Sequence, residues 1–157
     1  VSMKIALYNA DQRFYNAKKI QFISAYIGRY GYQKAIKQMP IWHKLFTQEE
    51  MTRNLELMEQ TVSLFRSSSN ALRANYARFL KMCSERMNEP ILLDAAEFFY
   101  LSAKHWSLFL KVIRATLKED YNKENIANQL KELAHQLDHI LQHETNAFQL
   151  INRYLHE

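Results

Sequence analysis

The sequence predicts an all-α fold, a bundle of five or six mostly antiparallel helices in a single domain that spans residues 1–157. Only two Gly and two Pro occur, too few for an all-β chain, which needs a turn about every 8–12 residues. Apolar residues instead recur at spacings of four and three over long stretches, which is the period of one helix face. A chain of 157 residues has the size of one domain with a buried core.

The first helix is expected to begin at a cap, Asn9 or Asp11, and to run to about Arg29. Gly28 and Gly31 bracket its expected end, because glycine readily adopts the positive φ found after a helix C-terminus. Four residues form its apolar face: Phe14, Ile20, Ile23 and Ile27.

A short helix and a capping box introduce the middle of the chain. The short helix, Tyr32–Gln38, should stop before Pro40, because a residue that precedes proline avoids the α region. Thr47 and Glu50 are three residues apart, so each side chain can bond the backbone amide of the other. One apolar seam follows: Met51, Leu55, Met58, Val62, Phe65, Ser69, Leu72, Tyr76, Phe79 and Cys83. We expect a kink or break at Ser67–Asn70, with one unbroken helix as the alternative.

Two long helices should complete the bundle. Pro90 suits the first position of one of them, and Asp120–Lys123 is the expected turn to the other. The first seam is Leu92, Ala96, Phe99, Ala103, Trp106, Leu110, Ile113 and Leu117. The second is Ile126, Leu130, Leu133, Leu137, Ile140, Glu144, Ala147, Ile151 and Tyr154. We expect all seams to meet in one core that buries Leu55, Val62, Phe79, Phe99, Trp106, Leu110, Leu133, Leu137 and Ile140.

Positive charge is concentrated in the first third. Residues 1–46 carry eight basic side chains and one acid, whereas residues 47–157 carry 13 basic and 15 acidic side chains. Lys34 and Lys37 are three apart and share a helix face. A solvated face is the favoured interpretation, and a surface for an acidic protein or a nucleic acid is the alternative. The protein partner is favoured over nucleic acid, because the aromatic residues follow apolar helical phase and form no stacking platform.

The sequence also predicts a cytoplasmic protein without membrane contact. No apolar run resembles a signal peptide or a membrane span. The single cysteine, Cys83, excludes an internal disulfide framework. Val1 and Ser2 precede Met3, so a longer natural chain with a further N-terminal domain stays open.

No complete active site is expected. A di-iron bundle needs two Glu-x-x-His pairs, and the one present, Glu132 with His135, should face outward. His135, His139 and His143, spaced by four, could bind a surface metal, but a polar outer face is favoured. Cys83 lies on an apolar seam, where cysteine is usually inert. We therefore expect no catalytic residue, no metal and no cofactor.

Two polar residues interrupt apolar surfaces. Glu144 occupies a seam position, and Arg73 follows seam residue Leu72. A buried carboxylate must be paired or protonated, and arginine matches both of its oxygens. A structural tie between helices is the favoured role of this pair, with a ligand or partner contact as the alternative.

Three segments together resemble the helical C-terminal domain of butirosin-biosynthesis-H-like proteins: Ser24–Trp42, Arg73-x-x-Tyr76-x-x-Phe79-Leu80 and Ala95–Trp106. The resemblance implies a papain-like N-terminal domain with a cysteine nucleophile, which transfers an acyl group from an acyl carrier protein to an aminoglycoside. That domain is not within these residues, so no catalytic residue carries over. The chain departs from the pattern at Ser67–Asn70, where family members tend to have glycines.

The expected function is that of a helical accessory or interaction domain that supports an acyltransferase-like or peptidase-like domain. Its partner would be that catalytic domain or an acidic carrier protein. The alternative is a stand-alone binding protein that uses its basic first third. The candidate binding residues are Arg73, Tyr76, Trp106, Glu144, Lys34 and Lys37.

Overall fold

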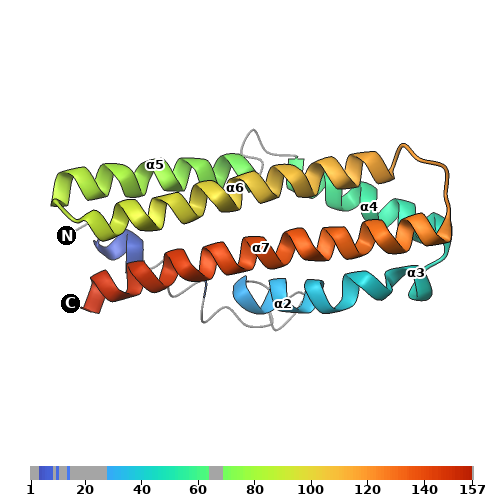
Figure 1. Cartoon of the computed structure of the whole chain (residues 1–157), viewed down its shortest axis with the longest axis horizontal. Helices are drawn as coiled ribbons and strands as arrows, with labels where there is room; N and C mark the ends of the chain where they lie inside the picture. Colours follow the sequence, from blue (N-terminus) through green and yellow to red (C-terminus); the bar gives the residue numbers. More distant parts are fainter. Residues whose placement is uncertain (1–3, 9, 11–13, 15–27, 64–68, 157) are drawn as a thin grey trace.

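Two long antiparallel helices form the spine of the molecule. The computed structural model describes residues 4–8, 10, 14, 28–63 and 69–156. Helices α6 (Pro90–Thr116) and α7 (Lys123–His156) run side by side along the long axis (Figure 1). No strand occurs in the described residues, and the predicted all-α bundle is confirmed.

The other helices pack along the two sides of this spine. α4 (Gln48–Ser63) and α5 (Ser69–Met87) both pack against α6. On the other side, α2 (Gly28–Gln38), the 3₁₀ helix η1 (Met39–Ile41) and α3 (Trp42–Leu45) pack against α7 (Figure 1). The predicted kink or break at Ser67–Asn70 lies partly on residues 64–68, outside the described residues, whereas Ser69 and Asn70 lie in α5.

The start of α2 corrects the sequence prediction. The short helix begins at Gly28 and not at Tyr32, and Gly31 lies within it. Gly28 has the positive φ that the sequence predicts there, 61°, and it is the first residue of α2. Glycine inside a helix costs about 1 kcal/mol, a small penalty that packing against α7 offsets. Most of the first predicted helix, from Asn9 or Asp11 onward, lies outside the described residues.

The face that α5 turns inward also differs from the prediction. Leu72 is 49% exposed and Phe79 is half-buried, whereas Ala77 and Leu80 are fully buried. The predicted seam carried the phase of α4 unchanged into α5. The inward face of α5 lies about one residue further along the chain than this phase, at Ala77 and Leu80, because it is set by packing against α6.

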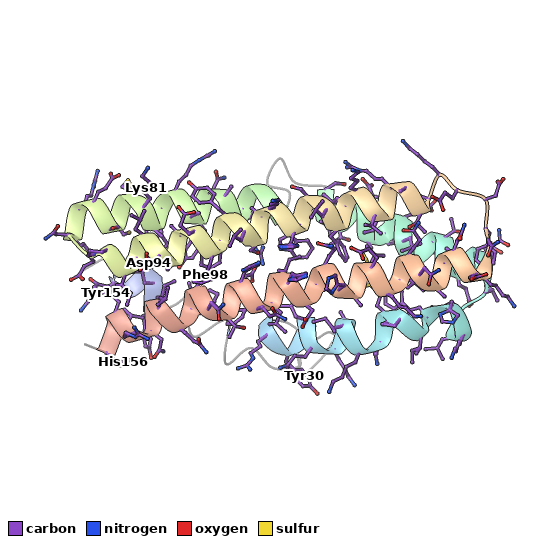
Figure 2. The ribbon with its side chains drawn as sticks, in the orientation of Figure 1. Tyr30, Lys81, Asp94, Phe98, Tyr154 and His156 are labelled. Atoms are coloured by element: carbon purple, nitrogen blue, oxygen red, sulfur yellow. The ribbon has the colours of Figure 1, made fainter. Side chains whose placement is uncertain are left out.

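The buried residues form two clusters, where one core was expected. The first cluster includes Leu110, Leu133 and Ile140, and Trp42 packs against it. The second lies toward the chain ends and includes Phe99 and Ile151. Figure 2 shows Tyr154 of α7 at the end of the bundle where α5 meets α6, and its hydroxyl contacts Met87 Sδ at 3.4 Å. The α6 and α7 seams are buried as predicted, except for half-buried Leu117 and Tyr154.

The predicted capping box is present at the start of α4. The Thr47 amide donates to Glu50 Oε2 at 2.8 Å, and the Glu50 amide donates to Thr47 Oγ1 at 3.3 Å. The hydrogen bond from the Thr47 amide, helped by the Thr47 hydroxyl, lowers the pKa of Glu50 below its ordinary value near 4.5. The ionised carboxylate is therefore the form that stabilises this helix end.

The capping box predicts a pH-dependent contribution to stability. Because the pKa of Glu50 is lower in the folded chain, its contribution is complete above the unfolded pKa and is lost as pH falls through the folded value. Wild type should be more stable than Glu50→Gln at pH 7, and the difference should vanish at pH 2–3. Urea midpoints at the two pH values measure this. A difference that stays constant with pH would contradict the assignment.

Candidate functional site

A buried polar cluster lies between the two core clusters. The Glu144 side chain on α7 is nearly inaccessible, since the residue is 2% exposed. Its Oε1 accepts hydrogen bonds from Arg73 Nε on α5 at 2.7 Å and from Ser102 Oγ on α6 at 2.8 Å. Its Oε2 accepts from the Tyr32 hydroxyl on α2 at 3.2 Å. The predicted burial of Glu144 and its pairing with Arg73 are confirmed. We call these four residues the Glu144 cluster.

The cluster is electrically balanced. Burial and the Glu144 carboxylate raise the pKa of Tyr32 above its usual range, so its hydroxyl stays protonated. The Tyr32 oxygen also accepts from Arg73 Nη2 at 2.9 Å. Burial alone lowers the pKa of Arg73, but the carboxylate of Glu144 reverses the effect and the net shift is upward. One positive and one negative charge thus connect four helices.

A pocket of about 450 Å³ lies beside the Glu144 cluster. Arg73 and Glu144 contribute its polar groups, and most of its remaining walls are apolar. They come from α2, η1, α3, α4, α6 and α7, and include Ala35, Met39, Trp42, Met58, Trp106 and Leu137. An apolar cavity of this size with a few convergent polar groups is typical of small-molecule sites. We call it the Trp106 pocket.

One residue that lines this pocket has a buried donor without a hydrogen-bond partner among the described residues, and the Arg73 guanidinium lies close to it. The indole Nε1 of Trp106 is buried and makes no hydrogen bond within the part of the chain that the structure describes. The Arg73 guanidinium lies 5.6 Å from the centroid of the Trp106 ring. Arg73 directs Nε and Nη2 at Glu144 and Tyr32, and its side chain is 25% exposed. An unsatisfied buried donor is costly, so an acceptor oxygen on a ligand would be stabilised here.

Three predicted binding residues lie away from the pocket walls. Tyr76 on α5 packs edge-on against Phe99, with ring centroids 4.8 Å apart, in the second core cluster. Lys34 and Lys37 both lie on α2, where Lys37 is exposed and Lys34 is half-buried. The structure therefore brings together Arg73, Trp106 and Glu144 but not the other three.

Sequence reasoning missed Tyr32 and Ser102. Tyr32 was taken only as the start of a short helix, and nothing local marks it as a partner of residue 144. Ser102 is a polar residue four positions before Trp106, next to the apolar seam, and this was the available signal. Trp42, which packs against the first core cluster, also lines the pocket.

Cys83 is placed as expected. It is fully buried in the second core cluster. Burial raises the pKa of its thiol, so the thiol stays protonated and weakly nucleophilic. This agrees with the structural role expected from the sequence.

Comparison with known proteins gives one match. The model of a family described as "Domain of unknown function (DUF4872)" matches residues 6–151. No curated protein and no solved structure matches the chain. Within the described residues, none of the helices combines the length and apolarity that crossing a membrane requires.

Proposed function

The chain belongs to the DUF4872 family, and we propose that it is a helical accessory domain whose Trp106 pocket binds an apolar group that carries an acceptor oxygen. The observation that carries this proposal is the pocket itself. Its walls are mostly apolar, and its lining residues include Trp106, whose buried Nε1 has no partner within the described residues, and the positively charged Arg73. A carbonyl or carboxylate at one end of an apolar chain has the chemistry that such a pocket recognises.

The resemblance noted from the sequence supports the same class of ligand. It implies a neighbouring domain that transfers acyl groups, and an acyl group is an apolar chain that ends in a carbonyl. The expected acidic partner also fits the surface beside the Trp106 pocket. Arg29 and Lys37 on α2 and Lys44 on α3 are exposed, and both helices contribute residues to the pocket wall. Such charges steer an acidic carrier protein toward the site.

Tryptophan emission offers a direct test of pocket binding. The chain has two tryptophans, Trp42 and Trp106, and both line the pocket. Titration with decanoate should therefore change the emission saturably. Decanol and decylamine keep the chain length and vary the head group. We expect decanoate to bind most tightly, because its oxygens accept from Arg73 and Trp106.

A matched pair of variants makes the test specific. Ala35→Leu fills the pocket, whereas Ala115→Leu adds the same atoms at an exposed position of α6. The larger side chain takes space that the ligand would occupy, so Ala35→Leu should weaken decanoate binding about tenfold, ~1.4 kcal/mol, and Ala115→Leu should leave it unchanged. Equal affinities for the two variants would refute the pocket as the binding site. Equal binding of decanoate and decylamine would refute the role of Arg73 and Trp106.

A further inference from the structure

Three histidine side chains from α6 and α7 lie close together, and each is half-buried. His105 lies on α6, and His139 and His143 lie one turn apart on α7. Each offers a ring nitrogen, and these nitrogens all lie within 4.8 Å of one another. The three rings are half-buried, so they are held by the fold but can be reached from solvent.

The convergence arises from two helices and not from one. His135, His139 and His143 span eight residues, which is about 12 Å along a helix axis, too far for all three to bind one ion. His105 replaces His135 because α6 passes directly beside this part of α7. Its ring lies 4.6 Å from the ring of His139 and 5.3 Å from that of His143, measured between centroids.

A second layer of hydrogen bonds orients His105. Gln136 Nε2 donates to Glu132 Oε1 at 2.6 Å, so the amide oxygen of Gln136 is turned toward His105. That oxygen lies 2.7 Å from His105 Nδ1. Because an amide oxygen only accepts, Nδ1 carries the proton and Nε2 keeps its lone pair. Metal-binding histidines are typically fixed in this way by an acceptor on the other ring nitrogen.

The other two rings are also suited to coordination. The Nδ1 of His143 is buried and has no hydrogen-bond partner within the described residues. The Phe98 ring on α6 lies 6.2 Å from the His143 ring, and Figure 2 shows Phe98 on the side of α6 that faces α7. His139 lies beside both other rings, with its ring centroid 4.6 Å from that of His105 and 6.4 Å from that of His143.

We propose that His105, His139 and His143 form a transition-metal site that binds zinc. Imidazole nitrogen is a ligand that suits zinc, copper and nickel, and three histidines leave a fourth tetrahedral position for water or a partner's group. Two nitrogens bound at about 2.05 Å to a tetrahedral ion lie about 3.3 Å apart. The histidine nitrogens here lie within 4.8 Å of one another, and small rotations of the side chains bring them to that distance. The ion would bridge α6 to α7.

Zinc titration of the whole chain tests the site. After treatment with a chelator, wild type should bind one zinc per chain in competition with a chromophoric chelator, and zinc should raise its melting temperature. Cobalt(II) in place of zinc should give the visible absorption of a four-coordinate ion. His105→Ala and His143→Ala should each weaken zinc binding by about tenfold or more. Circular dichroism in chelator checks that both variants remain folded.

Two further histidine variants serve as controls. His156→Ala changes an exposed histidine at the end of α7 (Figure 2) and should leave the zinc affinity unchanged. His135 is exposed, and its Nε2 lies 3.0 Å from His139 Nε2. Because the nitrogens that converge belong to His105, His139 and His143 and not to His135, His135→Ala should change the affinity less than His105→Ala does. Wild-type binding no tighter than that of His105→Ala, or an equal loss in His135→Ala, would overturn the three-histidine assignment.

Discussion

Replacing Glu144 with leucine should destabilise the protein by about 3–5 kcal/mol, the typical cost of removing one partner of a buried ion pair. The Arg73 guanidinium would keep its charge in a largely buried position and lose its carboxylate partner. Ser102 and Tyr32 would lose an acceptor at the same time. Reversible urea unfolding followed by circular dichroism measures the change.

Two companion variants separate charge from packing. Glu144→Gln keeps an acceptor oxygen, so it should destabilise the protein less than Glu144→Leu does. The double variant Arg73→Met with Glu144→Leu removes both charges and should be more stable than Glu144→Leu alone. If Arg73→Met adds its full single-variant cost to that of Glu144→Leu, the two residues are not coupled and the argument fails.

Leu137→Ala should cost about 2–5 kcal/mol, because it removes buried methyl groups and leaves a cavity. Leu137 is 5% exposed in the first core cluster and borders the Trp106 pocket. Leu137→Ala should also change the affinity for decanoate, because the smaller side chain enlarges the pocket.

An exposed leucine provides the control for this second variant. Leu57 on α4 is 52% exposed, and Leu57→Ala should change stability by no more than about 0.5 kcal/mol. A loss below about 0.5 kcal/mol in Leu137→Ala as well would show that residue 137 does not contribute to the core.

The sequence predicted the helices that carry strong local signals. Pro90, the capping box and the unbroken spacing of the α7 seam each act through neighbouring residues, and each is confirmed. The pairing of Arg73 with Glu144 was also predictable, because a carboxylate on an apolar seam must find a partner. Rotation of α5 was not predictable, since its phase depends on packing against α6 and not on its own pattern.

The remaining parts of the two sites depend on contacts between distant segments. Tyr32 reaches Glu144 over 112 residues and Gln136 reaches His105 over 31. One-dimensional spacing on α7 suggested His135 as a third neighbour of His139 and His143, whereas helix packing provides His105. Helical periodicity tells which residues share a face, but it does not tell which face of another helix lies opposite.

The separation of the Glu144 cluster along the chain has a consequence for protein synthesis. Tyr32 and Arg73 are made 112 and 71 residues before their shared acceptor. A nascent chain therefore contains α2 and α5 for a long interval before α7 can satisfy their polar groups. Contacts between segments this far apart in the sequence form slowly compared with single helices. The Trp106 pocket thus has no completed polar wall until residue 144 has been translated.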